Sequence, residues 1–167
     1  VRLVDAGAEG RVSKSQFGFC SGRSTLDAIF TLRRRVDVAW AQQTGRLLVL
    51  ALDWQKAFDA IDPSAMIGAL TRFGLPQHVL EVIRAIYSDR KFEVRDCGVT
   101  SHSRCQMSGI SQGCPLSPFL FVMLMTVLMH DAVNELPAKE KELMQRGDLA
   151  ELLYADDTAL ERVCRQS

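Results

Sequence analysis

The chain reads, from residue 152 to residue 158, Leu152-Leu153-Tyr154-Ala155-Asp156-Asp157-Thr158. Apolar runs on either side of a short polar pair predict a β-hairpin with the two acids at its turn. Two adjacent carboxylates repel each other unless a cation lies near them, and their hard oxygen atoms suit magnesium or manganese. An ordinary acidic turn explains the pair equally well, so the rest of the chain has to decide between a metal site and a surface turn.

Side chains of an extended strand alternate between its two faces, so Asp156 and Asp157 cannot both point into one site. We expect Asp156 to be the main ligand and Asp157 to accompany it. A third candidate, Asp53, follows the unbroken apolar run Leu47–Leu52, which predicts a strand buried on both faces in the centre of its sheet. A carboxylate at the end of such a strand is costly to bury without a cation or hydrogen-bond donors.

The amino-acid composition is that of one globular domain, because 47% of the 167 residues are apolar and 24% are charged. The longest apolar stretch, Phe119–Met129, is shorter than the roughly 18 residues that a membrane span needs, and it predicts a buried helix. The N-terminus carries no signal-peptide pattern. We expect an intracellular, non-secreted piece of a longer protein that has no membrane partner.

The cysteines and the charges give weaker indications. The five cysteines are scattered and form no C-x-x-C pair, so neither a zinc site nor a disulfide framework is predicted. The formal net charge is zero, but residues 1–50 hold eight Lys/Arg against four Asp/Glu, and residues 101–167 hold six against nine. This asymmetry is typical of a polyanion track that leads to an acidic metal site, and equally of plain solvated surface. Both interpretations stay open at this point.

Helix and hairpin signals divide the rest of the chain. Ser24 followed by Asp27 predicts a helix start, and Asp62-Pro63 predicts another that ends at Gly74. The further expected elements are a helix after Leu75-Pro76, a β-hairpin over residues 91–107, a helix from about Ser117 to Asn134 and a short surface helix or loop over 138–147.

The loop Ser108–Pro118 precedes the long apolar helix and contains two glycines. Glycine permits close approach of the backbone to a ligand, and backbone amides before a helix favour anions. Two carboxylates about a hundred residues apart, such as Asp53 and Asp156, can share two metal ions if their strands are neighbours. Such a pair, roughly 3.5–4 Å apart, stabilises the attacking and leaving oxygens of nucleotidyl transfer.

Four ordered stretches resemble motifs of reverse transcriptases of the non-LTR (LINE-like) retrotransposon kind. They are Gln16-Phe17-Gly18-Phe19 with Gly22-Arg23-Ser24-Thr25, then Leu52-Asp53-Trp54-Gln55-Lys56-Ala57-Phe58-Asp59-Ala60-Ile61, then Ser111-Gln112-Gly113-Cys114-Pro115-Leu116-Ser117-Pro118, and Tyr154-Ala155-Asp156-Asp157. The resemblance covers about residues 15–160, and its specificity comes from four motifs in order. Bacterial group II intron reverse transcriptases share much of this pattern and are the nearest relatives to exclude.

The resemblance implies an α+β fold: a right-hand polymerase palm, which is an antiparallel sheet backed by helices, with part of the fingers and without the thumb. Residues 1–46 would form a fingers segment, and residues 47–163 mainly palm with an interleaved fingers-side portion. The primer grip and the flanking domains of a longer polyprotein are expected outside this chain.

The resemblance also assigns roles to single residues. Asp53, Asp156 and Asp157 match the catalytic metal ligands, which would bind Mg²⁺ with Mn²⁺ as a substitute. Phe58 matches the aromatic side chain that packs under the incoming sugar and excludes a 2′-hydroxyl by its bulk, although a core phenylalanine explains the residue by itself.

Three further residues match substrate-side positions. Gln112 and Gly113 match positions that line the nucleotide and template side, and Arg23 is a candidate contact for the triphosphate or the template. All three positions belong to the quoted motifs and have no assignment from periodicity or charge alone.

The expected function is that of an RNA-directed DNA polymerase that uses an RNA template, a DNA primer and deoxynucleoside triphosphates. Its expected location is intracellular, and nuclear if the element is eukaryotic. One alternative is an RNA-templated RNA polymerase with the same palm, against which Phe58 argues. The other is a catalytically inactive remnant, or a nucleic-acid-binding module, of a decayed retroelement.

Overall fold

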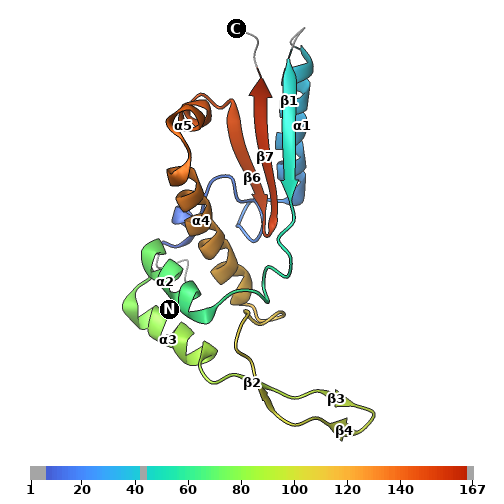
Figure 1. The fold of residues 1–167 in the computed structure, drawn as a ribbon, viewed down its shortest axis with the longest axis vertical. Coiled ribbons are helices and arrows are strands. Elements are labelled where there is room, and N and C mark those ends of the chain that lie inside the picture. The colour runs from blue at the N-terminus through green and yellow to red at the C-terminus, as the bar shows by residue number, and fades with distance from the viewer. Residues whose placement is uncertain (1–6, 42–44, 165–167) are drawn as a thin grey trace.

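The computed structural model describes residues 7–41 and 45–164. Its sheet has three antiparallel strands in the order β1-β7-β6, formed by β1 (Arg46–Leu52), β7 (Asp157–Cys164) and β6 (Leu149–Tyr154). The helix α1 (Thr25–Ala41) lies along one face of the sheet, and α5 (Ala138–Gln145) packs against β6 (Figure 1). The expected mixture of an antiparallel sheet with backing helices is therefore confirmed.

The C-terminal hairpin forms where the sequence predicts it. Strands β6 and β7 pair from Leu149↔Arg162 to Tyr154↔Asp157, and the two residues between them, Ala155 and Asp156, make the turn. Asp156 thus lies in the turn, whereas Asp157 is already the first residue of β7.

The prediction that Leu47–Leu52 is a central strand buried on both faces is wrong. Within the described residues β1 pairs only with β7, so it is an edge strand. Leu48 and Leu50 keep more than half of their surface exposed, and Val49 keeps 46%. The error has a physical reason: an unbroken apolar run shows that a strand has two apolar faces, but not that other elements cover them.

Local signals explain how the helices begin and end. Ser24 and Asp27 bond reciprocally at the start of α1, where the Ser24 N–H and hydroxyl both donate to the Asp27 carboxylate. Asp62 caps α2 (Pro63–Phe73) by accepting a hydrogen bond from the Ala65 N–H at 2.8 Å, and α2 ends at Gly74, which has a φ of 91°. The remaining helices are a short 3₁₀ turn (Glu9–Arg11), α3 (Gln77–Tyr87) and α4 (Ser117–Glu135).

The core lies between α4 and the helices α2 and α3. The fully buried apolar side chains that these three helices contribute include Met66, Leu70, Leu80, Ile83, Leu120, Phe121 and Met123. By length and composition α4 is apolar enough to cross a membrane, a test that the core helix of a globular domain also passes. Eight of its residues are buried inside the fold, as the sequence predicts for Phe119–Met129.

A long hairpin projects away from the rest of the molecule (Figure 1). It contains two short antiparallel pairs, β2 (Lys91–Phe92) with β5 (Arg104–Cys105) and β3 (Arg95–Asp96) with β4 (Val99–Thr100). All residues from 91 to 105 are exposed. The prediction of a hairpin over residues 91–107 is confirmed.

One buried ion pair fastens α1 to the sheet. The Glu161 carboxylate of β7 is 1% exposed, and Arg35 of α1 reaches it with its Nε atom at 2.8 Å. Arg35 also donates a hydrogen bond to the Gly147 carbonyl, at the loop before β6. Burial raises the pKa of Glu161, and the Arg35 charge opposes that increase.

At pH 7, Arg35→Ala should lower the free energy of unfolding by about 3 kcal/mol, because it leaves a buried carboxylate without its cation. The pKa of Glu161 then rises further above its value in the unfolded chain. Because the folded-state pKa lies above the unfolded-state pKa, ionisation of such an acid opposes folding. This penalty is complete above the folded-state pKa, decreases as the pH falls below it, and is gone below the unfolded-state pKa. The loss should therefore be smaller at pH 5 than at pH 7, as measured by urea unfolding.

Arg33→Ala is the matched control, because Arg33 pairs with Asp37 on the exposed side of the same helix. This change should alter the free energy of unfolding by less than about 0.5 kcal/mol at either pH. Equal losses for Arg33→Ala and Arg35→Ala would contradict the role assigned to the buried pair.

Candidate active site

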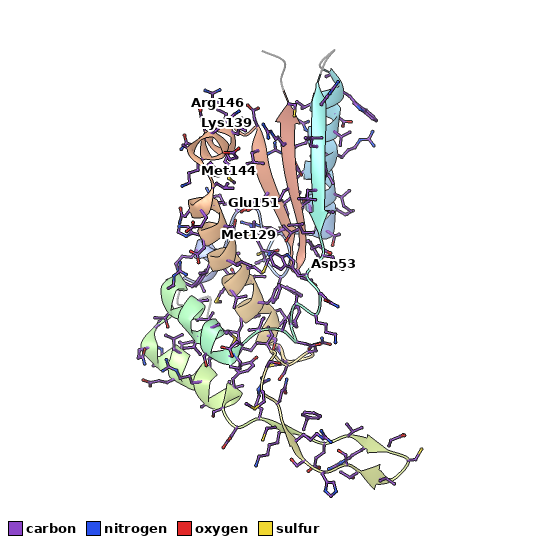
Figure 2. All side chains as sticks on the ribbon, viewed as in Figure 1. Asp53, Met129, Lys139, Met144, Arg146 and Glu151 are labelled. Carbon is purple, nitrogen blue, oxygen red and sulfur yellow. The ribbon has the colours of Figure 1, made fainter. Side chains whose placement is uncertain are left out.

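Asp53 stands directly after the last residue of β1 (Figure 2). Leu52, the residue before it, pairs with Thr158, so Asp53 and Asp157 follow one step beyond the last β1–β7 pair. Trp54 fastens this end of the sheet, because its Nε1–H donates a hydrogen bond to the Thr158 hydroxyl at 3.0 Å. The antiparallel register thus brings the first and the third acidic motifs to one end of the sheet.

The three acids differ in exposure, but none of them has a partner among the residues that the structure describes. Asp53 and Asp157 are exposed and Asp156 is half-buried. Within the described residues, none of the three carboxylates forms an ion pair or accepts a hydrogen bond. Uncompensated carboxylates at one end of a sheet are the electrostatic arrangement that a cation relieves.

The donor set fits a divalent cation in type. No three His, Cys, Asp or Glu side chains of the described chain cluster closely enough to enclose an ion by themselves. Mg²⁺, however, is usually held by one or two carboxylates together with waters and substrate phosphates, and not by a closed protein cage. Asp53 and Asp156 are the pair that would hold it, with Asp157 beside them.

Phe58 lies in the segment that joins β1 to α2. Its ring stacks on Phe121 of α4 with 4.4 Å between the ring centres and an interplanar angle of 12°. Its carbonyl accepts a hydrogen bond from the Ile110 N–H at 2.8 Å. The half-buried ring therefore both packs on the core and keeps an accessible side, and its role at the sugar stays a prediction.

Gln112 and Gly113 lie in the loop before α4, and both are exposed. The Gln112 side chain reaches Asp59 with an Nε2–Oδ1 distance of 3.4 Å, which links this loop to the segment that carries Phe58. Gly113 has a φ of 84°, and a Cβ atom there would meet nothing within 4 Å. The loop is thus open around Gly113, and the predicted roles of Gln112 and Gly113 stay untested.

Arg90 clamps the same loop from the base of the projecting hairpin. Its guanidinium donates to the Ser111 hydroxyl at 3.1 Å and to the Gly109 carbonyl, and it lies 4.5 Å over the ring of Tyr87. The Gly109 N–H in turn donates to the Ile61 carbonyl at 2.7 Å. Sequence reasoning assigned no role to Arg90, because nothing local marks an arginine whose partners lie about 20 residues away.

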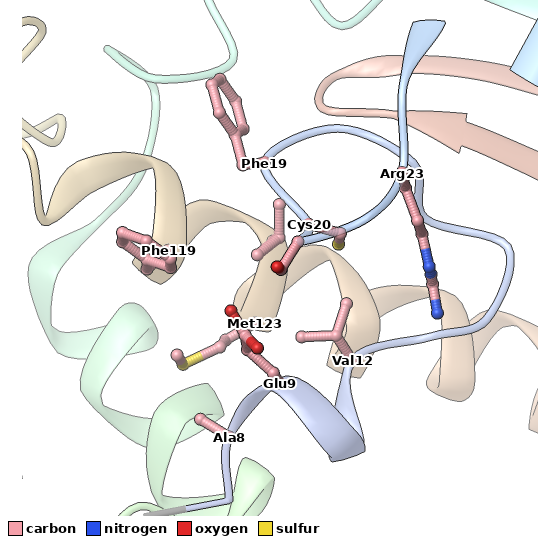
Figure 3. Close-up of a pocket in the computed structure, with 10 residues that line it drawn as sticks. Ala8, Glu9, Val12, Phe19, Cys20, Arg23, Phe119 and Met123 are labelled. Atoms are coloured by element: carbon pink, nitrogen blue, oxygen red, sulfur yellow. The ribbon is translucent and has the colours of Figure 1, made fainter. Parts of the chain in front are cut away.

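Arg23 is turned toward its own segment in this structure. Its Nη1 atom donates to the carbonyls of Ser13, Lys14 and Gln16. Figure 3 shows it at the side of a pocket between residues 8–23 and α4, which Phe19 and Met123 also line. The guanidinium therefore braces the N-terminal segment, and its predicted contact with triphosphate or template stays untested.

The reverse transcriptase (RNA-dependent DNA polymerase) family matches residues 2–161. The chain belongs to the reverse transcriptase family. Reverse transcriptases generally use a divalent metal ion, in keeping with the unpaired acids described above.

Relatives of the chain are retrotransposon proteins. It is 30% identical, over 67% of its length and 18% of the relative's, to the Pol polyprotein of retrotransposable element R2 from Popillia japonica. It is 30% identical to the R2 polyprotein of Nasonia vitripennis, covering 68% of this chain and 11% of the relative. It is 29% identical to the transposon TX1 149 kDa protein of Xenopus laevis, covering 83% of this chain and 10% of the relative. The chain spans less than a fifth of each relative, and the predicted resemblance to non-LTR elements is confirmed.

Solved telomerases share the fold. The telomerase of Candida albicans, in complex with a fragment of telomeric RNA, superposes with a TM-score of 0.66 at 15% identity, covering 96% of this chain and 28% of that one. The apo telomerase of Candida tropicalis superposes with a TM-score of 0.68 at 17% identity, covering 96% of this chain and 33% of that one. The expected polymerase palm with part of the fingers is therefore confirmed, whereas the boundary between residues 1–46 and 47–163 stays a prediction.

Gly109→Ala should destabilise the chain more than Gly113→Ala, although both glycines have a φ of 84°. Alanine costs about 1–2 kcal/mol of backbone strain at either position. At Gly109 the added Cβ would also lie 3.0 Å from the Cα and carbonyl oxygen of Asp59. We expect an additional loss of at least about 1 kcal/mol there in denaturant unfolding; equal losses would disprove the close packing of this loop against the Phe58 segment.

Proposed function

We propose that this chain is the catalytic palm segment of an RNA-directed DNA polymerase that works within a longer retrotransposon polyprotein. The observation that carries the proposal is the convergence of Asp53, Asp156 and Asp157 at one end of the β1–β7 pair, where all three lack partners in the described chain. Family membership and the R2 and TX1 relatives support it.

The proposed reaction adds a deoxynucleotide to a DNA primer on an RNA template. The oxygen of the primer 3′-hydroxyl bonds to the α-phosphorus of a deoxynucleoside triphosphate, and its proton passes to solvent. The bond from that phosphorus to the bridging oxygen breaks, and pyrophosphate leaves. Two divalent ions, Mg²⁺ or Mn²⁺ in its place, would supply positive charge at the attacking and leaving oxygens when bound.

The protein's contribution is to hold charge and substrate in place. Asp53 and Asp156 would present hard oxygen ligands from neighbouring strand ends, with Asp157 accompanying them. Because the β1–β7 register fixes these backbones before substrate arrives, little reorganisation is needed during the reaction. Positioning of this kind accounts for most of the catalysis in phosphoryl transfer.

The substrate side would be formed by the two segments joined at Phe58 and Ile110. The Phe58 ring would lie under the sugar and leave no room for a 2′-hydroxyl, while Gln112 and Gly113 would line the nucleotide and template side. Arg23 would contribute to template or triphosphate binding if its guanidinium left the carbonyls that it braces.

The proposed partners are an RNA template, a DNA primer and deoxynucleoside triphosphates. Binding to template and primer should weaken with salt, because it depends on phosphate contacts. We also propose that the protein acts inside the cell, in the nucleus if the host is eukaryotic.

Asp53→Asn and Asp156→Asn should each weaken Mn²⁺ binding by more than about tenfold in the presence of a deoxynucleoside triphosphate, because each removes one anionic ligand. Electron paramagnetic resonance of free Mn²⁺ measures this binding. Asp96→Asn, in the exposed hairpin, is the matched control and should leave the affinity unchanged. If Mn²⁺ affinity is unchanged by both site substitutions, the result would favour an inactive remnant or a nucleic-acid-binding module.

Phe58→Val should raise the affinity for a ribonucleoside triphosphate, relative to the deoxyribonucleoside triphosphate, by about tenfold, because the smaller side chain leaves room for one oxygen atom. Both affinities are measured with Mn²⁺ present on the same protein sample. A reduced folded fraction affects both of them equally and cancels in their ratio. Phe92→Val, at a ring that is 47% exposed in the hairpin, should leave the ratio unchanged. An unchanged ratio in Phe58→Val would assign the ring to core packing alone.

A further inference from the structure

The turn that carries Asp156 is held by a side chain from the other end of the sequence. Gln16 is fully buried, and its Oε1 atom accepts hydrogen bonds from the N–H of Ala155 at 2.9 Å and of Gly18 at 2.8 Å. Its Nε2 atom donates to the Ala155 carbonyl at 3.3 Å. One amide thus satisfies both backbone polar groups of the residue immediately before Asp156.

Ala155 needs such support because of its backbone conformation. It has a φ of 56°, in the left-handed region that residues with a Cβ atom rarely adopt. It is also buried, at 6% exposure, so water cannot replace the bonds from Gln16. Without these bonds the turn would lose the partners that offset its strain.

The segment that carries Gln16 is docked along the outer edge of β6. The Phe17 N–H donates to the Leu153 carbonyl at 2.8 Å, and the Leu153 N–H donates to the Ser15 carbonyl at 2.9 Å, which makes a short parallel bridge. Gly18 passes so close to the turn that an added Cβ would lie 2.3 Å from the Ala155 nitrogen. The contact therefore requires glycine, and it leaves the turn little freedom to shift.

We propose that Gln16 is a positioning residue for the metal-binding turn: its buried amide fixes the Ala155 backbone and thereby the direction of the Asp156 carboxylate. This inference rests on the proposed function of Asp156 as a metal ligand. Gln16 itself is fully buried and would act through Asp156 without touching metal or substrate. Groups that orient a metal ligand from behind typically change metal affinity by 10- to 100-fold when they are removed.

The test compares Gln16→Met with the wild-type chain. Methionine has nearly the same length and removes all three hydrogen bonds. We expect Mn²⁺ affinity, measured with a deoxynucleoside triphosphate present, to fall 10- to 100-fold. Amide hydrogen exchange should become faster at Ala155, while the β1–β7 amides, such as those of Ala159 and Leu160, keep their protection.

Gly18→Ala is the second variant, because it displaces the same turn by contact and leaves Gln16 in place. It should lower Mn²⁺ affinity in the same direction. Gly10→Ala is its control, since a Cβ there would meet nothing within 4 Å. If the β1–β7 amides lose their protection in Gln16→Met, the Mn²⁺ affinity of Gly18→Ala decides whether the turn positions the metal ligand. Loss of that protection in both variants would mean that these residues act only in folding and would overturn the proposal.

Ser15→Ala separates positioning from general support of the segment. The Ser15 hydroxyl donates to the Glu151 carboxylate of β6 at 2.6 Å and does not contact the turn. This change should lower the midpoint of thermal unfolding but leave Mn²⁺ affinity within twofold of wild type. An equal loss of affinity in Ser15→Ala and Gln16→Met would overturn the specific role of the amide.

Failure of this inference can be told from failure of the proposed function. If the proposed function fails, wild-type Mn²⁺ binding does not respond to Asp53→Asn or Asp156→Asn, and the positioning role falls with it. If only the inference fails, those substitutions weaken binding while folded Gln16→Met binds Mn²⁺ like wild type.

Discussion

The antiparallel pairing of β1 with β7 is the constraint on which the rest of the molecule depends. It joins residues more than a hundred positions apart in a fixed register that ends with Leu52 opposite Thr158. A slip by one residue would turn every side chain of β1 to the other face of the sheet and displace Asp53 from the turn. The Trp54–Thr158 hydrogen bond opposes such a slip at the start of β7, and the buried Arg35–Glu161 pair holds α1 against the second half of β7.

Elements with strong local signals could be predicted from the sequence. Asp62 before a proline, and Gly74 after an apolar stripe, define α2 because capping chemistry acts within one turn of a helix. The β6–β7 hairpin follows in the same way from two apolar runs around a polar pair. The position of β1 at the sheet edge could not be predicted, since it depends on which elements lie beside an apolar strand and not on the strand itself.

In the candidate site, too, the residues with local sequence signals could be predicted and those that depend on tertiary contacts could not. The acidic residues could be found from the sequence because a divalent-metal site needs carboxylate ligands. The order of the motifs along the chain supports the same residues. The positioning role of Gln16 could not be predicted, although Gln16 begins the first of the four motifs, because its hydrogen-bond partner lies 139 residues later in the chain. Its burial with every polar atom bonded is the signal, and only tertiary structure carries it. Gly109 is similar, because its role depends on having no Cβ atom where the backbone of Asp59 passes close by.

The exposed position of β1 has a consequence for the behaviour of the chain in solution. In the described part of the molecule no strand pairs with its outer edge, and Leu48, Val49 and Leu50 stand exposed along it. A bare apolar edge is the template on which strands of another molecule add. With a net charge of zero, little long-range repulsion keeps molecules apart. Self-association through this edge should therefore increase with protein concentration and be reduced by a lysine placed within β1.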